Sequence, residues 1–141
     1  MPMLSVRGTA VAFDGRGLLI LGATGSGKSG LAIRLMARGA MLVSDDRVEL
    51  RQAGAQVAMR APDAIRGRIE ARMLGLLSVD VCDDAALQLV VDLDQESQTR
   101  MPQPQYITYL GSSVRLISGA NVPNIDDVLT LLMNNAGRMS D

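Results

Sequence analysis

Short apolar blocks alternate with turn-forming residues along most of the chain, and this spacing is typical of strands rather than long helices. The blocks are four to ten residues long in most cases and end at glycine, proline, asparagine or aspartate, as at Asp14-Gly15 and near Gly54. Together they predict strands over residues 4–13, 18–21, 41–43, 47–50, 56–59, 78–81, 87–93, 106–110 and 114–117. Residues 65–77 show no clear period.

Two segments have the period of an amphipathic helix. In residues 28–38, with Gly39 as the candidate cap, the apolar face consists of Leu31, Ala32, Leu35 and Met36. In the segment that Asn124 can cap, the apolar face consists of Ile125, Val128, Leu129 and Leu132. Residues 94–105 hold two prolines and few apolar side chains, which predicts a mobile loop. We therefore expect one α/β domain over residues 1–141, with a strand-rich mixed sheet and about two main helices.

Composition narrows the possible functions. The 141 residues are 48% hydrophobic, enough to bury the core of one domain, and the formal net charge of −1 gives no basic surface for nucleic acid. No apolar run approaches the roughly 20 residues of a membrane span, and MPMLSVRG does not read as a signal peptide. With Cys82 as its single cysteine, the chain is expected to be cytoplasmic. The absence of histidine excludes Ser-His-Asp catalysis and histidine zinc sites.

The strongest motif is G-x-x-x-x-G-K-S, the phosphate-binding loop, or P-loop. It is made by Gly22, Ala23, Thr24, Gly25, Ser26, Gly27, Lys28 and Ser29. A predicted strand precedes it and a predicted helix follows it, so backbone N–H groups and the positive end of the helix dipole can meet phosphate. Lys28, the one lysine among 14 basic residues, suits the outer phosphates, and the Ser29 hydroxyl suits Mg²⁺. The alternative is a glycine-rich turn, and the motif leaves nucleotide and reaction open.

Carboxylates follow two predicted strands at the edge where ligands of open α/β sheets bind. Asp45 and Asp46 come directly after the strand that follows the P-loop, so one could hold Mg²⁺ or orient its partner while the other accepts a proton. Asp92 ends a later apolar strand and is the alternative metal ligand. Glu70 and Arg72 would point to one face of a strand, toward Mg²⁺ and phosphate. Exposed acidic turns and a surface ion pair are the alternatives to these assignments.

The order of these pieces resembles the C-terminal catalytic domain of HPr kinase/phosphorylase. The resemblance is carried by the P-loop and the strand before it, by Arg38-Gly39-Ala40, and by Leu-Val-Ser-Asp-Asp-Arg-Val at 42–48. Residues 70–75, Glu-Ala-Arg-Met-Leu-Gly, resemble the family signature Glu-Ile-Arg-Gly-Leu-Gly, with Met73 where the family has Gly. The resemblance covers residues 7–94, and Arg100-Met101-Pro102 is similar to an Arg-Leu-Pro stretch that carries an active-site Arg of the family.

This resemblance implies an enzyme that uses ATP to phosphorylate a seryl residue of HPr, the phosphocarrier of the sugar phosphotransferase system. It implies ATP on residues 22–29, Mg²⁺ on Ser29 and Glu70, and a proton acceptor in the aspartate pair. We assign that role to Asp46, with Asp45 as its neighbour, and expect Lys28 and Arg100 to contact phosphate. The family also implies a homo-oligomer.

The sequence departs from the family in three places, and two of them make the phosphorylase activity doubtful. Arg7 stands where the family has an active-site His, and the basic stretch linked to the reverse reaction is absent from this sequence. The sequence also lacks the N-terminal regulatory domain, which we interpret as the short form found in some bacteria. The alternatives are a non-catalytic ATP-binding sensor and a small-molecule P-loop kinase.

Overall fold

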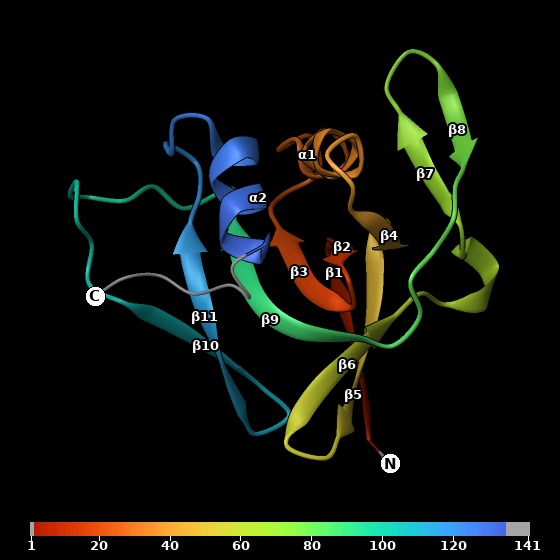
Figure 1. Cartoon of the computed structure of the whole chain (residues 1–141), viewed down its shortest axis with the longest axis horizontal. Coiled ribbons are helices and arrows are strands. Elements are labelled where there is room, and N and C mark those ends of the chain that lie inside the picture. Colours follow the sequence, from red (N-terminus) through yellow and green to blue (C-terminus); the bar gives the residue numbers. More distant parts are fainter. Residues whose placement is uncertain (1, 135–141) are drawn as a thin grey trace.

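The computed structural model describes residues 2–134 and contains, within them, a curled nine-stranded mixed sheet, a separate hairpin and two α-helices (Figure 1). This arrangement confirms the predicted fold class. The main path of the sheet runs β1 (Met3–Arg7), β5 (Arg47–Ala53), β6 (Gln56–Arg60), β9 (Ala85–Asp92), β3 (Arg16–Leu21), β2 (Thr9–Phe13) and β4 (Met41–Ser44). Beside this path, β11 (Ser112–Ser118) pairs with β9, and β10 (Gln105–Tyr109) pairs with β11.

The long strand β9 organises the sheet because its two halves pair with different strands. Its first residues pair antiparallel with β6, and its second half pairs in parallel with β11. Along its other edge it runs parallel to β3, so β3 and β9 end at the same side of the sheet. The P-loop follows β3 directly, and parallel strands place ligand sites at these carboxyl ends.

Both helices cover one face of the sheet (Figure 1). Leu31 and Leu35 of α1 (Lys28–Met36) and Leu129 and Met133 of α2 (Ile125–Asn134) are buried in the same cluster as alternate residues of β2, β3 and β9. The opposite face is closed by the curl of the sheet, which packs residues of β5, β6, β10 and β11 against it. One face therefore carries the helices, and the other forms a core between strands.

Charged side chains join the two helices at their exposed edge. Arg38, two residues after α1, contacts both Asp126 and Asp127 in the first turn of α2, at 3.1 Å and 3.0 Å. Burial raises the pKa of the Asp126 carboxyl, but backbone hydrogen bonds and the charges of Arg38 and Arg34 offset this and leave its pKa below the usual value. The acidic first turn that the sequence predicts thus serves as the contact with α1.

The structure differs from the predicted elements in two places. The segment 4–13 is two strands, because Gly8 turns the chain: its N–H donates to the Asp46 carbonyl at 3.0 Å, and a Cβ there would lie 2.8 Å from the Ile20 carbonyl oxygen. The predicted strand 78–81 is wrong. Residues 68–78 form a hairpin of β7 (Arg68–Ala71) and β8 (Gly75–Ser78), and strands of four residues are too short to give a clear period in the sequence. Within residues 2–134, no helix has the length and apolar content that crossing a bilayer requires.

We expect Leu129→Ala to lower the free energy of unfolding by about 2–5 kcal/mol, because it leaves a cavity beneath α2. Leu129 is 1% exposed, whereas Leu131 on the same helix is 65% exposed and provides the matched control. Leu131→Ala should change the free energy of unfolding by less than about 0.5 kcal/mol. Urea denaturation of the two variants checks this, and equal effects would contradict the packing of α2 described above.

Candidate functional site

The P-loop lies where the sequence predicts it, between the end of β3 and the start of α1. Gly25 and Gly27 adopt φ angles of 86° and 100°, which glycine tolerates and other residues rarely adopt. A Cβ at either position would meet no atom within 4 Å, so the loop is open toward the cavity that both glycines line. Within residues 2–134, α1 has no side-chain cap at Gly27. Its first N–H groups are therefore available to an anion.

The Lys28 side chain lies against its own loop. Its Nζ donates to the carbonyl oxygens of Gly22 at 2.7 Å and Ala23 at 3.1 Å. These bonds hold the ammonium group at the side of the loop, beside the open cavity. A phosphate in the loop would find this positive charge close by, as the motif requires.

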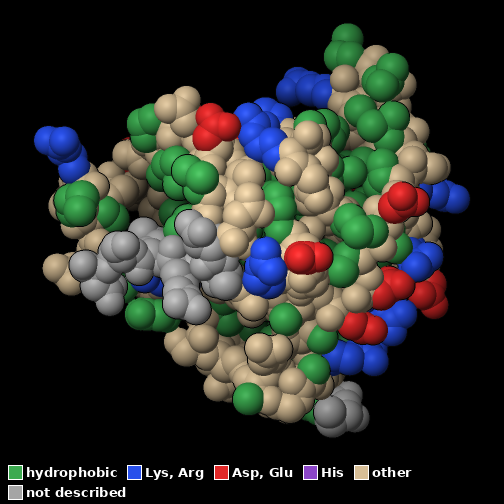
Figure 2. All heavy atoms as spheres, in the orientation of Figure 1, with side chains coloured by type: hydrophobic (Ala, Val, Ile, Leu, Met, Phe, Trp, Pro, Cys, Tyr) green, Lys and Arg blue, Asp and Glu red, His purple; other side chains and the backbone are tan. Residues whose placement is uncertain are grey.

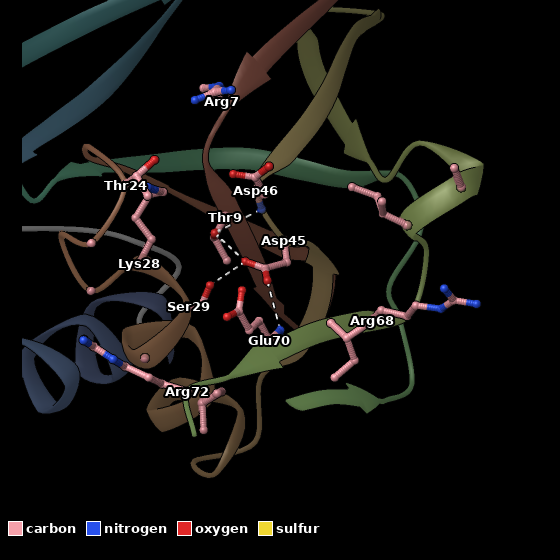
Figure 3. Close-up of a pocket in the computed structure, with 17 residues that line it drawn as sticks. Arg7, Thr9, Thr24, Lys28, Ser29, Asp45, Asp46, Arg68, Glu70 and Arg72 are labelled. Carbon is pink, nitrogen blue, oxygen red and sulfur yellow. Dashed lines mark hydrogen bonds between the residues drawn. The ribbon is translucent and has the colours of Figure 1, made fainter. Parts of the chain in front are cut away.

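Asp45 is the most highly connected polar side chain of the site (Figure 3). Its Oδ1 accepts hydrogen bonds from the Ser29 hydroxyl at 2.7 Å and the Thr9 hydroxyl at 2.9 Å, and its Oδ2 accepts one from the Glu70 amide at 3.2 Å. One half-buried carboxylate therefore joins α1, β2 and β7 to the end of β4. Sequence reasoning found Asp45, Ser29 and Glu70 but missed Thr9, whose only signal is a hydroxyl inside an otherwise apolar strand.

Asp46 has a different environment from its neighbour. Its backbone has φ of 72°, its carbonyl accepts from Gly8 N–H, and its N–H lies 3.4 Å from the Thr9 hydroxyl. Aspartate tolerates this left-handed conformation better than most residues. The backbone thus fixes Asp46 at the cavity wall, and its exposed carboxylate has no hydrogen-bond partner among residues 2–134.

These groups surround one cavity with a volume of about 890 Å³. Its wall contains the P-loop, both aspartates and, from β7 and the residue after it, Arg68, Glu70 and Arg72. Figure 3 shows the Glu70 carboxylate directed toward Ser29, whereas Arg68 extends away from it. Alternation along β7 places Glu70 and Arg72 on the cavity side while Ile69 is fully buried. The structure therefore brings Asp45, Asp46 and Glu70 to one cavity with five of the predicted P-loop residues: Thr24, Gly25, Gly27, Lys28 and Ser29. Gly22, Ala23 and Ser26 do not line this cavity.

The oxygen atoms beside Ser29 are of the kind that Mg²⁺ prefers. The Ser29 hydroxyl and the Asp45 and Glu70 carboxylates are hard oxygen donors on one side of the open cradle. Within residues 2–134, no group of three or more histidine, cysteine or acidic side chains is close enough to enclose a metal. Mg²⁺ commonly completes its coordination with water and substrate phosphates, so this donor set fits that ion.

Asp92 and Arg100 lie outside this cavity. The Asp92 Oδ1 accepts from the Asp94 N–H at 2.9 Å, and the Asp94 Oδ2 accepts from the Ala23 N–H at 2.8 Å. Asp94, which follows β9, therefore holds the backbone of the P-loop, and Asp92 at the end of β9 positions Asp94. Sequence reasoning did not find this role. Arg100 lines a second cavity beside β11 and α2, together with Arg115. Its contact with phosphate stays a prediction that requires the loop 94–105 to move.

Arg7 is the last residue of β1, where it pairs with Arg47 of β5. Its exposed guanidinium lines the cavity, and Figure 3 shows it beyond Asp46, at the side away from Ser29. Arg7 therefore adds a positive charge to the cavity wall, in addition to the one that Lys28 provides at the loop.

Comparison with known proteins finds the same family along almost the whole chain. The family model for the HPr serine kinase C-terminal domain matches residues 1–126. An HPr kinase/phosphorylase of Lachnoclostridium phytofermentans is 35% identical over 126 residues, which are 80% of this chain and 41% of that protein. One of Caldicellulosiruptor bescii is 36% identical over 126 residues, again 80% of this chain and 40% of that protein. The chain thus spans about two fifths of the length of these relatives.

A solved structure extends this similarity to the fold. The Hpr(Ser) kinase/phosphatase from Coxiella burnetii matches with a TM-score of 0.79 and 26% sequence identity, covering 94% of this chain and 90% of that chain. The fold of this chain therefore has a counterpart in a solved structure of a protein named as an Hpr(Ser) kinase/phosphatase.

Proposed function

This chain belongs to the HPr serine kinase C-terminal domain family, and from that membership we propose that it is an ATP-dependent protein-serine kinase whose acceptor is a seryl residue of HPr. One observation above all supports the proposal: Asp45 joins the P-loop serine to the strand end that also presents Asp46 to the same cavity. The residues proposed to bind phosphate and the residue proposed to accept the proton therefore line the same cavity.

The chain binds ATP through the P-loop. Backbone N–H groups at the start of α1 face the β- and γ-phosphates, and Lys28 moves from the Gly22 and Ala23 carbonyls to the phosphate oxygens. Ser29 and Glu70 would hold Mg²⁺, and Asp45 orients the Ser29 hydroxyl by accepting its hydrogen bond. Bound there, Mg²⁺ would neutralise charge on the outer phosphates.

Asp46 accepts the proton of the attacking serine. The serine oxygen forms a bond to the γ-phosphorus, the bond from that phosphorus to the bridging oxygen breaks, and ADP leaves with the electron pair. The proton of the hydroxyl passes to the Asp46 carboxylate, which is open to the cavity, whereas both oxygens of Asp45 already accept hydrogen bonds. Because the Asp45 oxygens already accept hydrogen bonds and those of Asp46 are open to the cavity, we assign proton acceptance to Asp46 and orientation of Ser29 to Asp45.

The substitution at position 7 favours a second candidate, a nucleotide sensor without transfer activity. A guanidinium cannot exchange a proton near neutral pH, so Arg7 removes whatever acid–base role a histidine has there. The two candidates differ in one measurement. A kinase transfers the labelled γ-phosphate of ATP to purified HPr, whereas a sensor binds Mg-ATP and transfers nothing.

Lys28→Ala is expected to weaken Mg-ATP binding sharply, because it removes the only lysine of the chain from the phosphate loop. Calorimetric titration with Mg-ATP measures the change. Arg51→Ala removes one positive charge from β5, outside the cavity, and should leave the affinity unchanged. Equal affinities of Lys28→Ala and the unaltered protein would refute nucleotide binding by this loop.

Asp46→Asn should lower phosphate transfer to HPr by about 10²–10⁴-fold, because asparagine keeps the shape but cannot accept the proton. Its affinity for Mg-ATP should change little. Asp45→Asn is the matched variant on the neighbouring residue, and we expect it to weaken Mg-ATP binding as well, since it disturbs the partner of Ser29. If Asp92→Asn abolished transfer and Asp46→Asn did not, the base would be Asp92 at the end of β9, and the assignment to Asp46 would be wrong.

Arg7 should bias the enzyme toward phosphorylation. The reverse reaction needs a group that donates a proton, and the Arg7 guanidinium cannot donate one near neutral pH, whereas a histidine at this position can. We expect little phosphate-dependent dephosphorylation of phosphoserine-HPr by the unaltered protein, and a gain in Arg7→His. Assays in both directions test this, and robust dephosphorylation by the unaltered protein would contradict it.

A further inference from the structure

The tip of the β7–β8 hairpin exposes more apolar surface than any other turn described here. Met73 is 99% exposed, Leu74 75% and Leu76 68%. The hairpin projects from the body of the molecule (Figure 1), and hydrophobic side chains gather on that projection (Figure 2). Isolated exposed leucines are ordinary, but three neighbouring side chains on one projection form a patch of the kind that marks an interaction site.

Met73 occupies a backbone conformation that does not suit it. Its φ is 69°, in the left-handed region that glycine adopts freely and a side chain such as methionine disfavours. The family signature has glycine at this position, which is the residue that the turn favours. Met73 therefore combines an unfavourable backbone conformation with a fully exposed apolar side chain. Core packing explains neither property, because Met73 is not part of either core cluster.

The patch adjoins the catalytic cavity and stands on a fixed base. Ile69 is fully buried in the helix-side cluster, and Leu77 packs against the same cluster, so the base of the hairpin is anchored. Arg72 and Leu76 line the cavity, and the residues between them form the tip. Any macromolecule that inserts a side chain into the cavity from this side therefore meets Met73 and Leu74.

We propose that Met73, Leu74 and Leu76 dock the acceptor protein, contacting an apolar patch beside the hydroxyl that becomes phosphorylated. This proposal rests on the protein kinase function proposed above. A small-molecule acceptor held inside the cavity would not touch Met73 or Leu74, which do not line it. A second copy seated on the tip would cover the cavity rim and compete with the acceptor. Methionine is flexible and polarizable, which suits a docking surface that must adapt to a partner.

The test uses the double variant Met73→Ser/Leu74→Ser, which changes neither a cavity residue nor the core. With purified HPr as acceptor, KM for HPr should rise by about 10-fold or more, as expected when central apolar contacts are lost. The kcat and the affinity for Mg-ATP should stay unchanged. Leu131→Ser is the matched control, since Leu131 is 65% exposed on α2, and its KM should equal that of the unaltered protein.

A second variant separates docking from a structural role. Met73→Gly relieves the left-handed strain, so its Tm should rise while its KM for HPr also rises. A merely structural Met73 would change Tm and leave KM as it was, and that result overturns the proposal. So does an unchanged KM in the double variant, or light scattering that shows an oligomer of the unaltered protein dissociating in the double variant.

The same measurements distinguish failure of the proposed kinase function from failure of the docking role. If the unaltered protein binds Mg-ATP but transfers no phosphate to HPr, the proposed kinase function is refuted and the docking role falls with it. Transfer to HPr with equal KM in all variants refutes the docking role alone.

Discussion

The Asp45 carboxylate is the interaction on which the site depends. A half-buried charge is stable only when donors satisfy it, and Asp45 takes its donors from three other segments: Ser29 of α1, Thr9 of β2 and the Glu70 amide of β7. Satisfying this one group therefore fixes the start of α1 relative to the sheet and holds the hairpin against the cavity. The same contacts leave Asp46 directed at the open space.

A second carboxylate completes the support of the phosphate loop. Asp94 accepts the Ala23 amide from the side of β9, while Asp45 holds Ser29 from the side of β4. The loop is thus held at both ends by acidic side chains, and its glycines between them stay open to the cavity. Groups fixed in place before the reactants arrive need little reorganisation, and in the proposed kinase this would favour phosphate transfer.

Two departures from the family pattern, Arg7 and Met73, lie at or beside the rim of the cavity, whereas the phosphate loop keeps the full motif. Arg7 stands at the aspartate side and Met73 at the tip of the hairpin. In the proposed kinase, changes at the rim would alter the direction of the reaction or the choice of acceptor and leave nucleotide binding unchanged. The two regions are separate because the phosphate loop lies between β3 and α1, whereas Arg7 belongs to β1 and Met73 follows β7.

The amino-acid sequence by itself determined the elements whose signals are local. The phosphate loop is contiguous, α1 and α2 repeat apolar residues over two or more turns, and Asp45 and Asp46 directly follow an apolar strand. Only the tertiary structure decided which distant groups meet. Thr9 and Asp45 are 36 residues apart, and Asp94 reaches Ala23 across 71 residues. The tertiary structure also decided that Gly8 splits one apolar run into two strands and that residues 68–78 form a hairpin. Such contacts depend on how strands pair and curl, and pairing between distant segments leaves no periodic pattern in either segment alone.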